Sequence, residues 1–181
     1  ATCTSTIKKM WPLMIQEGSA EERARVAFLA DKVLDVSQFL VEKVGLAAGD
    51  LSKKSKKSKK SGKEKVAITY HDPCHLKKSL GVAGQPRALI RANGRYELKE
   101  MAEADWCCGC GGSFNLQQYE ISAAIGRRKR DHVLKSGAQI VATGCPACML
   151  QLTDMLSQAG ARVQVKHAVE IYAEILAGTK D

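Results

Sequence analysis

The sequence predicts an α/β fold in which a parallel sheet carries helices on both faces. After residue 65, short β-type runs alternate with helical segments, which is the pattern of successive βαβ units. Three cysteine-bearing segments, HDPCH, WCCGCGG and TGCPAC, each follow a predicted strand. Because functional groups collect at the carboxyl ends of parallel strands, we expect a cysteine cluster at that edge of the sheet.

The first part of the chain is predicted to be helical. Residues 4–15 form a short helix that Pro12 cuts or bends, and residues 21–44 repeat apolar side chains at helical spacing. A low-complexity segment, residues 52–65, contains eight Lys and one Glu and supplies most of the net charge of +9. We expect a solvated linker, although a tether to an acidic partner or an anionic membrane would use the same charge. Specific nucleic-acid binding is disfavoured, because no aromatic side chain lies among these lysines.

The alternating part of the chain ends in a helix. Its predicted strands are residues 66–70, 96–101, 139–143 and 162–165, and its predicted helices are residues 85–92, 115–136, 145–158 and 167–176. Gly137 and Gly160 mark the ends of two of these helices. No apolar stretch is long enough for a membrane span.

An internal repeat connects the two ends of the chain. When Cys3 is aligned with Cys148, the apolar residues that follow coincide, and residues 35–44 match residues 167–176 further along. The aligned apolar pairs are Ile7 with Leu152, Met10 with Met155 and Trp11 with Leu156. The predicted parts are the end of a first cysteine-rich repeat, a Lys/Ser-rich flexible linker and a complete second repeat, at residues 1–50, 51–65 and 66–181.

Seven cysteines are many for a chain of 181 residues. Their odd number and the hydrophobic content of 45% disfavour a secreted scaffold held together by disulfides. Metal-bound thiolates in a reduced compartment fit better. We therefore expect a cytoplasmic location, with the inner face of the membrane as an alternative.

Cys107 and Cys108 are adjacent, which restricts what they can bind. A disulfide between neighbours would be strained, and one zinc ion that took both thiolates would have a distorted tetrahedron. A polynuclear cluster avoids this conflict, because each thiolate can bind a different iron. Gly109, Gly111 and Gly112 permit positive φ and let the backbone approach such a cofactor closely. We therefore expect a multi-metal site in which these glycines contact the cofactor.

Cys145-Pro-Ala-Cys148 is predicted to begin a helix, with Cys145 as the N-cap and Pro146 at the first helical position. Both thiols then lie at the positive end of the helix, where the thiolate is favoured. A thioredoxin-like redox pair has the same local sequence and is an alternative interpretation.

Cys74 lies between two histidines in HDPCH, and its position after a strand favours a ligand over a buried structural cysteine. We interpret His71 and His75 as hydrogen-bond donors or titrating groups near the cofactor, and neither as a metal ligand. Cys110 is interpreted as a free thiol or a packed loop residue rather than a ligand.

The arrangement C-x32-CCG-x35-CPAC, formed by Cys74, Cys107-Cys108-Gly109 and Cys145–Cys148, resembles the cysteine-rich CCG domain. This domain occurs in heterodisulfide reductase and in the iron–sulfur subunits of glycolate oxidase and lactate dehydrogenase complexes. The resemblance covers about residues 65–178 and implies a Rossmann-like α/β fold. It also implies a four-iron cluster, non-cubane in heterodisulfide reductase, although some CCG domains are thought to hold zinc instead. The metal ligands that it implies are Cys74, Cys107, Cys108, Cys145 and Cys148.

The resemblance implies an iron–sulfur electron-transfer subunit of an oxidoreductase complex, of the type that oxidises lactate, glycolate or another 2-hydroxy acid. The implied partners are a flavoprotein dehydrogenase subunit and other iron–sulfur subunits, with peripheral association at a membrane. The sequence assigns no residue to substrate oxidation. Two alternatives stay open: a catalytic subunit that cleaves a disulfide, as in heterodisulfide reductase, and a zinc-stabilised module that docks partner subunits.

Overall fold

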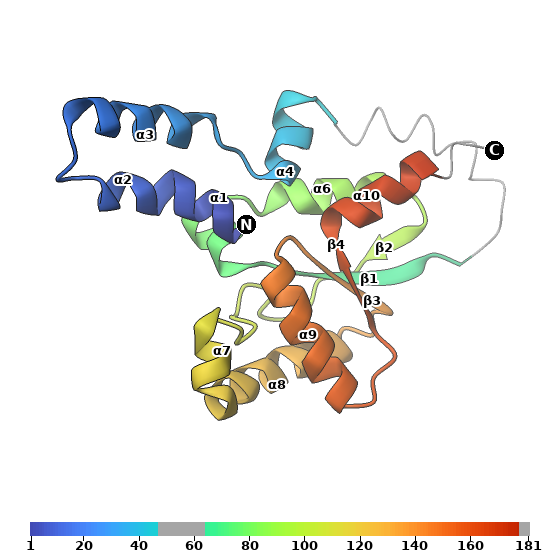
Figure 1. Ribbon diagram of the computed structural model, residues 1–181. Helices are drawn as coiled ribbons and strands as arrows, with labels where there is room; N and C mark the ends of the chain where they lie inside the picture. The colour runs from blue at the N-terminus through green and yellow to red at the C-terminus, as the bar shows by residue number, and fades with distance from the viewer. Residues whose placement is uncertain (47–63, 178–181) are drawn as a thin grey trace.

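A four-stranded parallel sheet forms the centre of the protein, as Figure 1 shows. The computed structural model describes residues 1–46 and 64–177. The strands are β1 (Val66–His71), β2 (Tyr96–Leu98), β3 (Ile140–Thr143) and β4 (Gln164–His167), in the spatial order β2-β1-β3-β4. All the strand pairs of this sheet are parallel, and Ile68 of β1 lies opposite both Leu98 and Ile140. The predicted α/β fold with a parallel sheet is confirmed.

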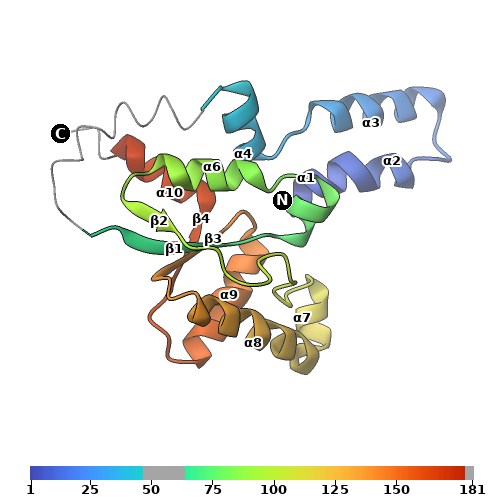
Figure 2. The same cartoon turned by 180° about the vertical axis from the view of Figure 1, so that it is seen from behind.

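Helices cover both faces of the sheet, which can be followed in Figure 1 and, from behind, in Figure 2. α6 (Gly84–Ala92) and α10 (Ala168–Ala177) lie on one face, and α8 (Tyr119–Lys135) and α9 (Pro146–Gln158) lie on the other. Because successive strand residues point to opposite faces, Ala142 joins the core beneath α6 and α10, whereas Val141 joins the core beneath α8 and α9.

Two shorter helical turns precede the longer helices. They are η4 (His75–Ser79), a π-type turn after β1, and α7 (Ser113–Gln117). The single helix predicted for residues 115–136 is interrupted at Gln118, whose backbone (φ −132°, ψ 51°) is not helical. The bend places Asn115 between α8 and α9, where its Nδ2 donates to Ser122 Oγ (2.9 Å) and Gln151 Oε1 (2.7 Å).

The N-terminal segment is helical, as predicted, but it divides differently. Its elements are α1 (Thr2–Ser5), η1 (Thr6–Met10), α2 (Trp11–Met14), α3 (Ala20–Lys32), α4 (Val36–Gln38) and η2 (Phe39–Lys43). The helical spacing expected over residues 21–44 is interrupted at Val33, where the backbone becomes extended. The reason is local, because Asp35 Oδ1 accepts a hydrogen bond from Ser37 N (2.9 Å) and thereby caps a new helix.

This N-terminal segment contacts the sheet domain at one end and extends away from it at the other (Figure 1). Leu40 and Val41 of η2 pack against a cluster formed by Leu89 and Tyr172. α2 and α3 pair with each other beyond the edge of the sheet. The predicted linker, residues 51–65, lies outside the described residues except for its last two positions. Among the described residues, no helix is long and apolar enough to cross a membrane.

Candidate metal centre

Cysteines from separate loops meet at the carboxyl edge of the sheet. Cys108, in the loop before α7, and Cys145 and Cys148, at the start of α9, are buried in one cluster. Cys108 Sγ lies 3.2 Å from Cys148 Sγ. Cys110 is half-buried and packs against the margin of this cluster. The predicted cysteine cluster is therefore present, and its centre is formed by three of the five predicted ligands.

The other two predicted ligands are less buried. Cys107 is exposed, and its Sγ accepts a hydrogen bond from Gly109 N (3.3 Å). Cys74 is half-buried and immediately precedes η4. A hydrogen bond with Cys108, together with burial and the charges of Cys108 and Cys74, raises the pKa of the Cys107 thiol. Cys107 and Cys74 therefore form the outer part of the same group.

The start of α9 favours one thiolate. Cys145 is the N-cap and Pro146 the first residue of the helix, as predicted. The pKa of Cys145 is lowered to about 5, because the Cys148 thiol and then the backbone N–H groups of Cys148 and Ala147 hydrogen-bond to its sulfur. Burial opposes this shift without overcoming it.

Cys108 and Cys148 compete for one proton. Hydrogen bonds from Cys107 and Cys148, and then the nearby imidazole of His71, hold the pKa of Cys108 well below its usual range. Cys148 lies between Cys108 and Cys145, and its hydrogen bonds to these two sulfurs, with burial, raise its pKa strongly. Like-charged neighbours titrate this way, since a second buried thiolate beside a first is unfavourable. A bound cation would remove the conflict, because it stabilises both thiolates together.

His71, the last residue of β1, lies against the same sulfurs. Its side chain is 1% exposed, and its Nδ1 lies 3.2 Å from Ala104 O. Its other nitrogen, Nε2, is buried and has no hydrogen-bond partner in the described part of the chain. One ring nitrogen of His71 and the sulfurs of Cys108 and Cys148 all lie within 4.8 Å of one another. This group is compact enough to hold a metal ion.

The two histidines of HDPCH thus have different surroundings. His75 is exposed on η4, and its Nδ1 lies 3.5 Å from Thr2 Oγ1, which in turn lies 3.8 Å from Cys145 Sγ. The sequence did not separate His71 from His75. The length of the predicted strand could have separated them. The predicted strand ends at residue 70, whereas β1 continues by one residue, so that His71 lies at the buried carboxyl end of a central strand.

The donor set therefore fits a metal centre bound mainly by thiolates. It combines closely packed sulfurs, of which Cys145 and Cys108 favour the thiolate, with a buried imidazole nitrogen that has no partner among the described residues. Soft thiolate and imidazole donors select iron–sulfur clusters or zinc over magnesium or calcium.

Comparison with known proteins agrees with this chemistry. Residues 68–153 match the family model of the cysteine-rich domain named CCG. This part of the chain belongs to the CCG family. The match includes Cys74, the Cys107-Cys108-Gly109 sequence and the Cys145–Cys148 segment, and it excludes the N-terminal helices.

Three curated relatives extend the similarity beyond the CCG domain. Lactate utilization protein A of Oceanobacillus iheyensis is 31% identical over 143 residues, which is 79% of this chain and 54% of the relative. An uncharacterised iron–sulfur protein of Methanococcus maripaludis is 33% identical over 127 residues, 70% of this chain and 23% of the relative. One subunit of the dihydromethanophenazine:CoB–CoM heterodisulfide reductase of Methanosarcina barkeri is 28% identical over 179 residues, 97% of this chain and 39% of the relative. The chain thus spans about half or less of the length of these relatives.

The loop that contains Cys107-Cys108-Gly109, residues 106–112, is called the CCG loop below. Its glycines have positive φ, as predicted, at +93° for Gly109, +57° for Gly111 and +63° for Gly112. They differ in what surrounds them. A Cβ atom on Gly109 would lie 2.4 Å from Ser122 O of α8, whereas a Cβ on Gly112 would meet nothing within 4 Å. Ser122 Oγ also donates to Gly109 O (2.8 Å). Gly109 therefore lets the CCG loop pack directly on α8, which holds Cys108 in place.

Glu103 fixes the turn that leads into Cys107. Its φ is +52°, which is unusual for a residue other than glycine, and its carbonyl accepts hydrogen bonds from Trp106 N and Lys129 Nζ. Its carboxylate accepts two hydrogen bonds from Arg128 (2.7 and 3.0 Å) and lies 3.1 Å from His132 Nε2. The α8 helix thus holds this turn through three side chains.

A buried ion pair fixes the HDPCH loop in the same way. Asp72 is 2% exposed and receives two hydrogen bonds from Arg87 of α6 (2.7 and 2.9 Å). Lys77 Nζ lies 3.6 Å from the same carboxylate, and Arg87 also covers the ring of Tyr70, 4.8 Å from its centroid. Strand β1, which precedes Cys74, and η4, which follows it, are therefore both held in place through the Asp72 carboxylate.

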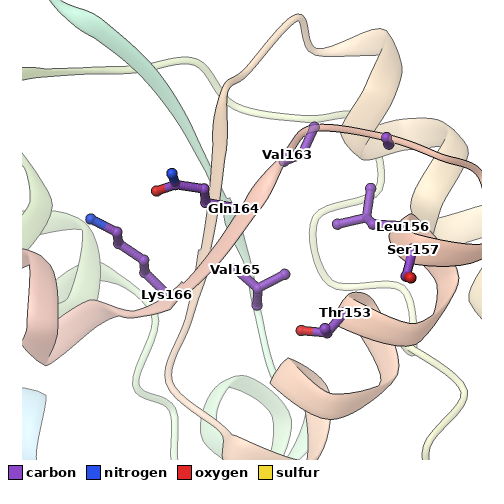
Figure 3. Close-up of a pocket in the computed structure, with 8 residues that line it drawn as sticks. Thr153, Leu156, Ser157, Val163, Gln164, Val165 and Lys166 are labelled. Carbon is purple, nitrogen blue, oxygen red and sulfur yellow. The ribbon is translucent and has the colours of Figure 1, made fainter.

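A pocket beside the edge strand β4 lies away from these groups. Figure 3 shows it between α9 and β4, where Val165 points toward α9 while Gln164 and Lys166 point to the opposite side of the strand. The lining residues are Thr153, Leu156, Ser157, Ala161, Val163, Gln164, Val165 and Lys166. Since none of them is a cysteine or histidine, this pocket does not belong to the metal centre.

Proposed function

We propose that this chain is an iron–sulfur electron-transfer subunit of an oxidoreductase complex that oxidises lactate, glycolate or a related 2-hydroxy acid. The observation that carries the proposal is the cysteine group at the carboxyl edge, in which adjacent Cys107 and Cys108 have different environments. Cys108 is buried against Cys148, whereas Cys107 is exposed. Adjacent thiolates that differ in burial in this way suit different irons of one cluster.

Five thiolates would hold the cluster: Cys74, Cys107, Cys108, Cys145 and Cys148. When bound, the cluster accepts and releases single electrons. The chain contributes burial of the inner sulfurs, the Gly109 N–H that donates to Cys107 Sγ and the buried cation of Lys129. Burial, hydrogen bonds to sulfur and nearby charge are the factors that set the reduction potential of such centres.

The partners in this proposal are a flavoprotein dehydrogenase subunit and other iron–sulfur subunits, in the cytoplasm or at the inner face of the membrane. Similarity to a lactate utilization protein supports the substrate class. The exposed edge at Cys107 supports electron exchange with a partner, because an electron carrier must approach the centre closely. Trp106 is 42% exposed at this edge, with Arg128 stacked 4.0 Å from its ring centroid.

A second candidate is a catalytic subunit that cleaves a disulfide at a non-cubane four-iron cluster. Similarity to a heterodisulfide reductase subunit favours it. A zinc-stabilised docking module is the third candidate, since Cys108, Cys148 and His71 already form a compact set.

Metal analysis of anaerobically purified protein separates these candidates. We expect iron, acid-labile sulfide and a brown visible spectrum that Cys108→Ala abolishes or alters and Cys110→Ala leaves largely intact. Cys110 is the matched control, because it lies in the same loop but only at the margin of the buried cluster. A colourless protein with one zinc and no sulfide would contradict both redox candidates.

We also propose that residues 1–50 are the end of a first CCG repeat whose remainder covers the N-terminal helices. Met155 and Leu156 of α9 are 0% and 2% exposed, whereas their counterparts Met10 and Trp11 are 49% and 40% exposed. The N-terminal copy thus has the apolar face of α9 without a sheet against it. In a longer polypeptide that continues before Ala1, we expect the fluorescence of Trp11 to shift to the blue; an unchanged emission would contradict the proposal.

A further inference from the structure

The hydrogen bond of His71 determines which of its nitrogens carries a proton. Nδ1 lies 3.2 Å from Ala104 O, and a carbonyl oxygen can only accept. Nδ1 must therefore be the protonated nitrogen. In the neutral imidazole, Nε2 is then left with a free lone pair.

That nitrogen is buried and makes no hydrogen bond of normal geometry to the described residues, and the imidazole lies close enough to Cys108 to help lower the pKa of its thiol. One ring nitrogen of His71 and the sulfurs of Cys108 and Cys148 all lie within 4.8 Å of one another, and with Nδ1 held by Ala104 the nitrogen free to face the sulfurs is Nε2. A buried nitrogen without a partner is unfavourable, and such exceptions in native proteins call for a ligand or an ordered solvent molecule.

The same arrangement is found where histidine binds metals. A metal-bound imidazole commonly donates its other N–H to a backbone carbonyl, which fixes the tautomer and the ring orientation. Ala104 O has this role here, and it is fixed in turn because it also accepts from Asp72 N (2.9 Å). His71 is therefore already oriented as a ligand.

We propose that Nε2 of His71 is a metal ligand of this centre, beside Cys108 and Cys148. The inference rests on the proposed function only in that the centre holds a metal; it applies equally to an iron–sulfur cluster and to a single ion. Beside the five proposed thiolates, a neutral imidazole adds no negative charge to an iron–sulfur cluster, which favours a higher reduction potential than a further thiolate would. His71 would thus adjust the potential as well as hold the metal.

The test uses the full chain with its native metal removed and Co²⁺ added, because Co²⁺ reports its ligands by visible absorption. The informative variant is His71→Asn, whose amide N–H can still donate to Ala104 O but which has no ring nitrogen. His75→Asn is the matched control, from the same motif but on the exposed side of η4. We expect His71→Asn to lower the Co²⁺ affinity about 10-fold or more and to shift the d–d bands, and His75→Asn to change neither.

Labelling histidine with ¹⁵N distinguishes a ligand from a neighbour. Pulsed electron paramagnetic resonance of the Co²⁺ protein, or of the reduced cluster, should show a strongly coupled nitrogen in the native chain and in His75→Asn, and none in His71→Asn. A native spectrum without that coupling, or a Co²⁺ affinity of His71→Asn within twofold of the native value, would overturn the proposal. If the purified metal is zinc but the nitrogen coupling of the Co²⁺ form is present, the redox function fails while this inference stands.

Discussion

At the scale of single residues, Gly109 is the point where the CCG loop comes closest to α8. Its φ is +93°, and a Cβ added there would lie 2.4 Å from Ser122 O, which leaves no room for a side chain. Gly112, three residues on, also has positive φ but lies in open space. The two glycines therefore separate the effect of backbone conformation from the effect of packing.

We expect Gly109→Ala to lower the free energy of unfolding by about 3 kcal/mol or more, because α8 must shift as well as the loop. Gly112→Ala meets no atom and should lower it by about 2 kcal/mol, the backbone penalty alone for an L-residue at φ 63° and ψ −121°. Urea denaturation of both variants in the same metal-bound state measures the difference. Equal losses would show that Gly109 is required only for its φ.

Lys129 has an unusual place for a lysine, since its side chain is 0% exposed beneath the CCG loop. Burial lowers its pKa to about 8 from 10.5, while the charges of Cys108, Asp105 and Glu103 oppose the shift. Between pH 8 and 10.5 the unfolded chain binds more protons than the folded chain at this position. The contribution of Lys129 therefore makes stability rise with pH across this window.

Loss of the Lys129 proton favours the folded chain, so the native protein should gain stability as the pH rises. We expect the free energy of unfolding of the native chain to rise more between about pH 7.5 and 9.5 than that of Lys129→Met, in which this titration is absent. Lys135→Met is the control, because Lys135 is an exposed lysine of the same helix. Parallel pH profiles for the native chain and Lys129→Met would contradict the expected titration.

At the scale of elements, the Asp72–Arg87 ion pair joins α6 to the HDPCH loop. The Asp72 carboxylate is 2% exposed, and without Arg87 its nearest remaining cation among the described residues would be Lys77, at 3.6 Å. We expect Arg87→Met to lower the free energy of unfolding by about 3 kcal/mol, because a buried carboxylate loses the two hydrogen bonds of its main charged partner. Chemical denaturation at one fixed pH measures this loss.

Arg91 supplies the control for this prediction on the next turn of α6. It is 58% exposed and lies 4.0 Å from Glu100, so Arg91→Met should change the free energy of unfolding by less than about 0.5 kcal/mol. A similar loss in both variants would mean that the helix, rather than the ion pair, accounts for the effect.

The elements also show what the sequence could and could not predict. The strands at Val66 and Ile140 and the start of α9 at Pro146 were predicted closely, because each depends on a local signal of β-branched residues or proline at a helix start. The breaks at Val33 and Gln118 were missed, because the apolar spacing continues across them. Their causes are a cap and a contact between helices, and the second involves residues distant in sequence.

The candidate site also contains residues that the sequence could place and residues that it could not. The spacing of the cysteines places Cys108, Cys145 and Cys148 in one group, since loops after parallel strands share an edge. Only the structure distinguishes His71 from His75, because that difference depends on Ala104, which lies 33 residues away. The roles of all these residues as ligands are proposals for the metal analysis to test.

At the scale of the whole molecule, the cysteine group connects parts of the chain that are far apart in sequence. Without metal, the loop before Cys107 is held by the contacts of Glu103, and the HDPCH loop by Asp72 and Arg87. At the start of α9, the Cys148 sulfur then competes with the Cys108 sulfur for one proton. The metal-bound state should therefore be more rigid in these three loops than the metal-free state, because a metal that binds only the folded chain stabilises it.

We expect removal of the metal by a chelator to lower the midpoint of thermal unfolding and to raise hydrogen exchange at the end of β1, in residues 103–112 and in the first turn of α9. A stabilisation of about 2 kcal/mol or more corresponds to a shift of at least about 4 °C for a chain of this size. The internal control is α3, whose capping box of Ser19 and Glu22 is independent of the metal and whose exchange should not change. Uniform acceleration that includes α3 would instead mean that metal loss unfolds the chain as one unit. No change in the three loops would mean that their own contacts hold the centre in its metal-binding geometry before any metal arrives.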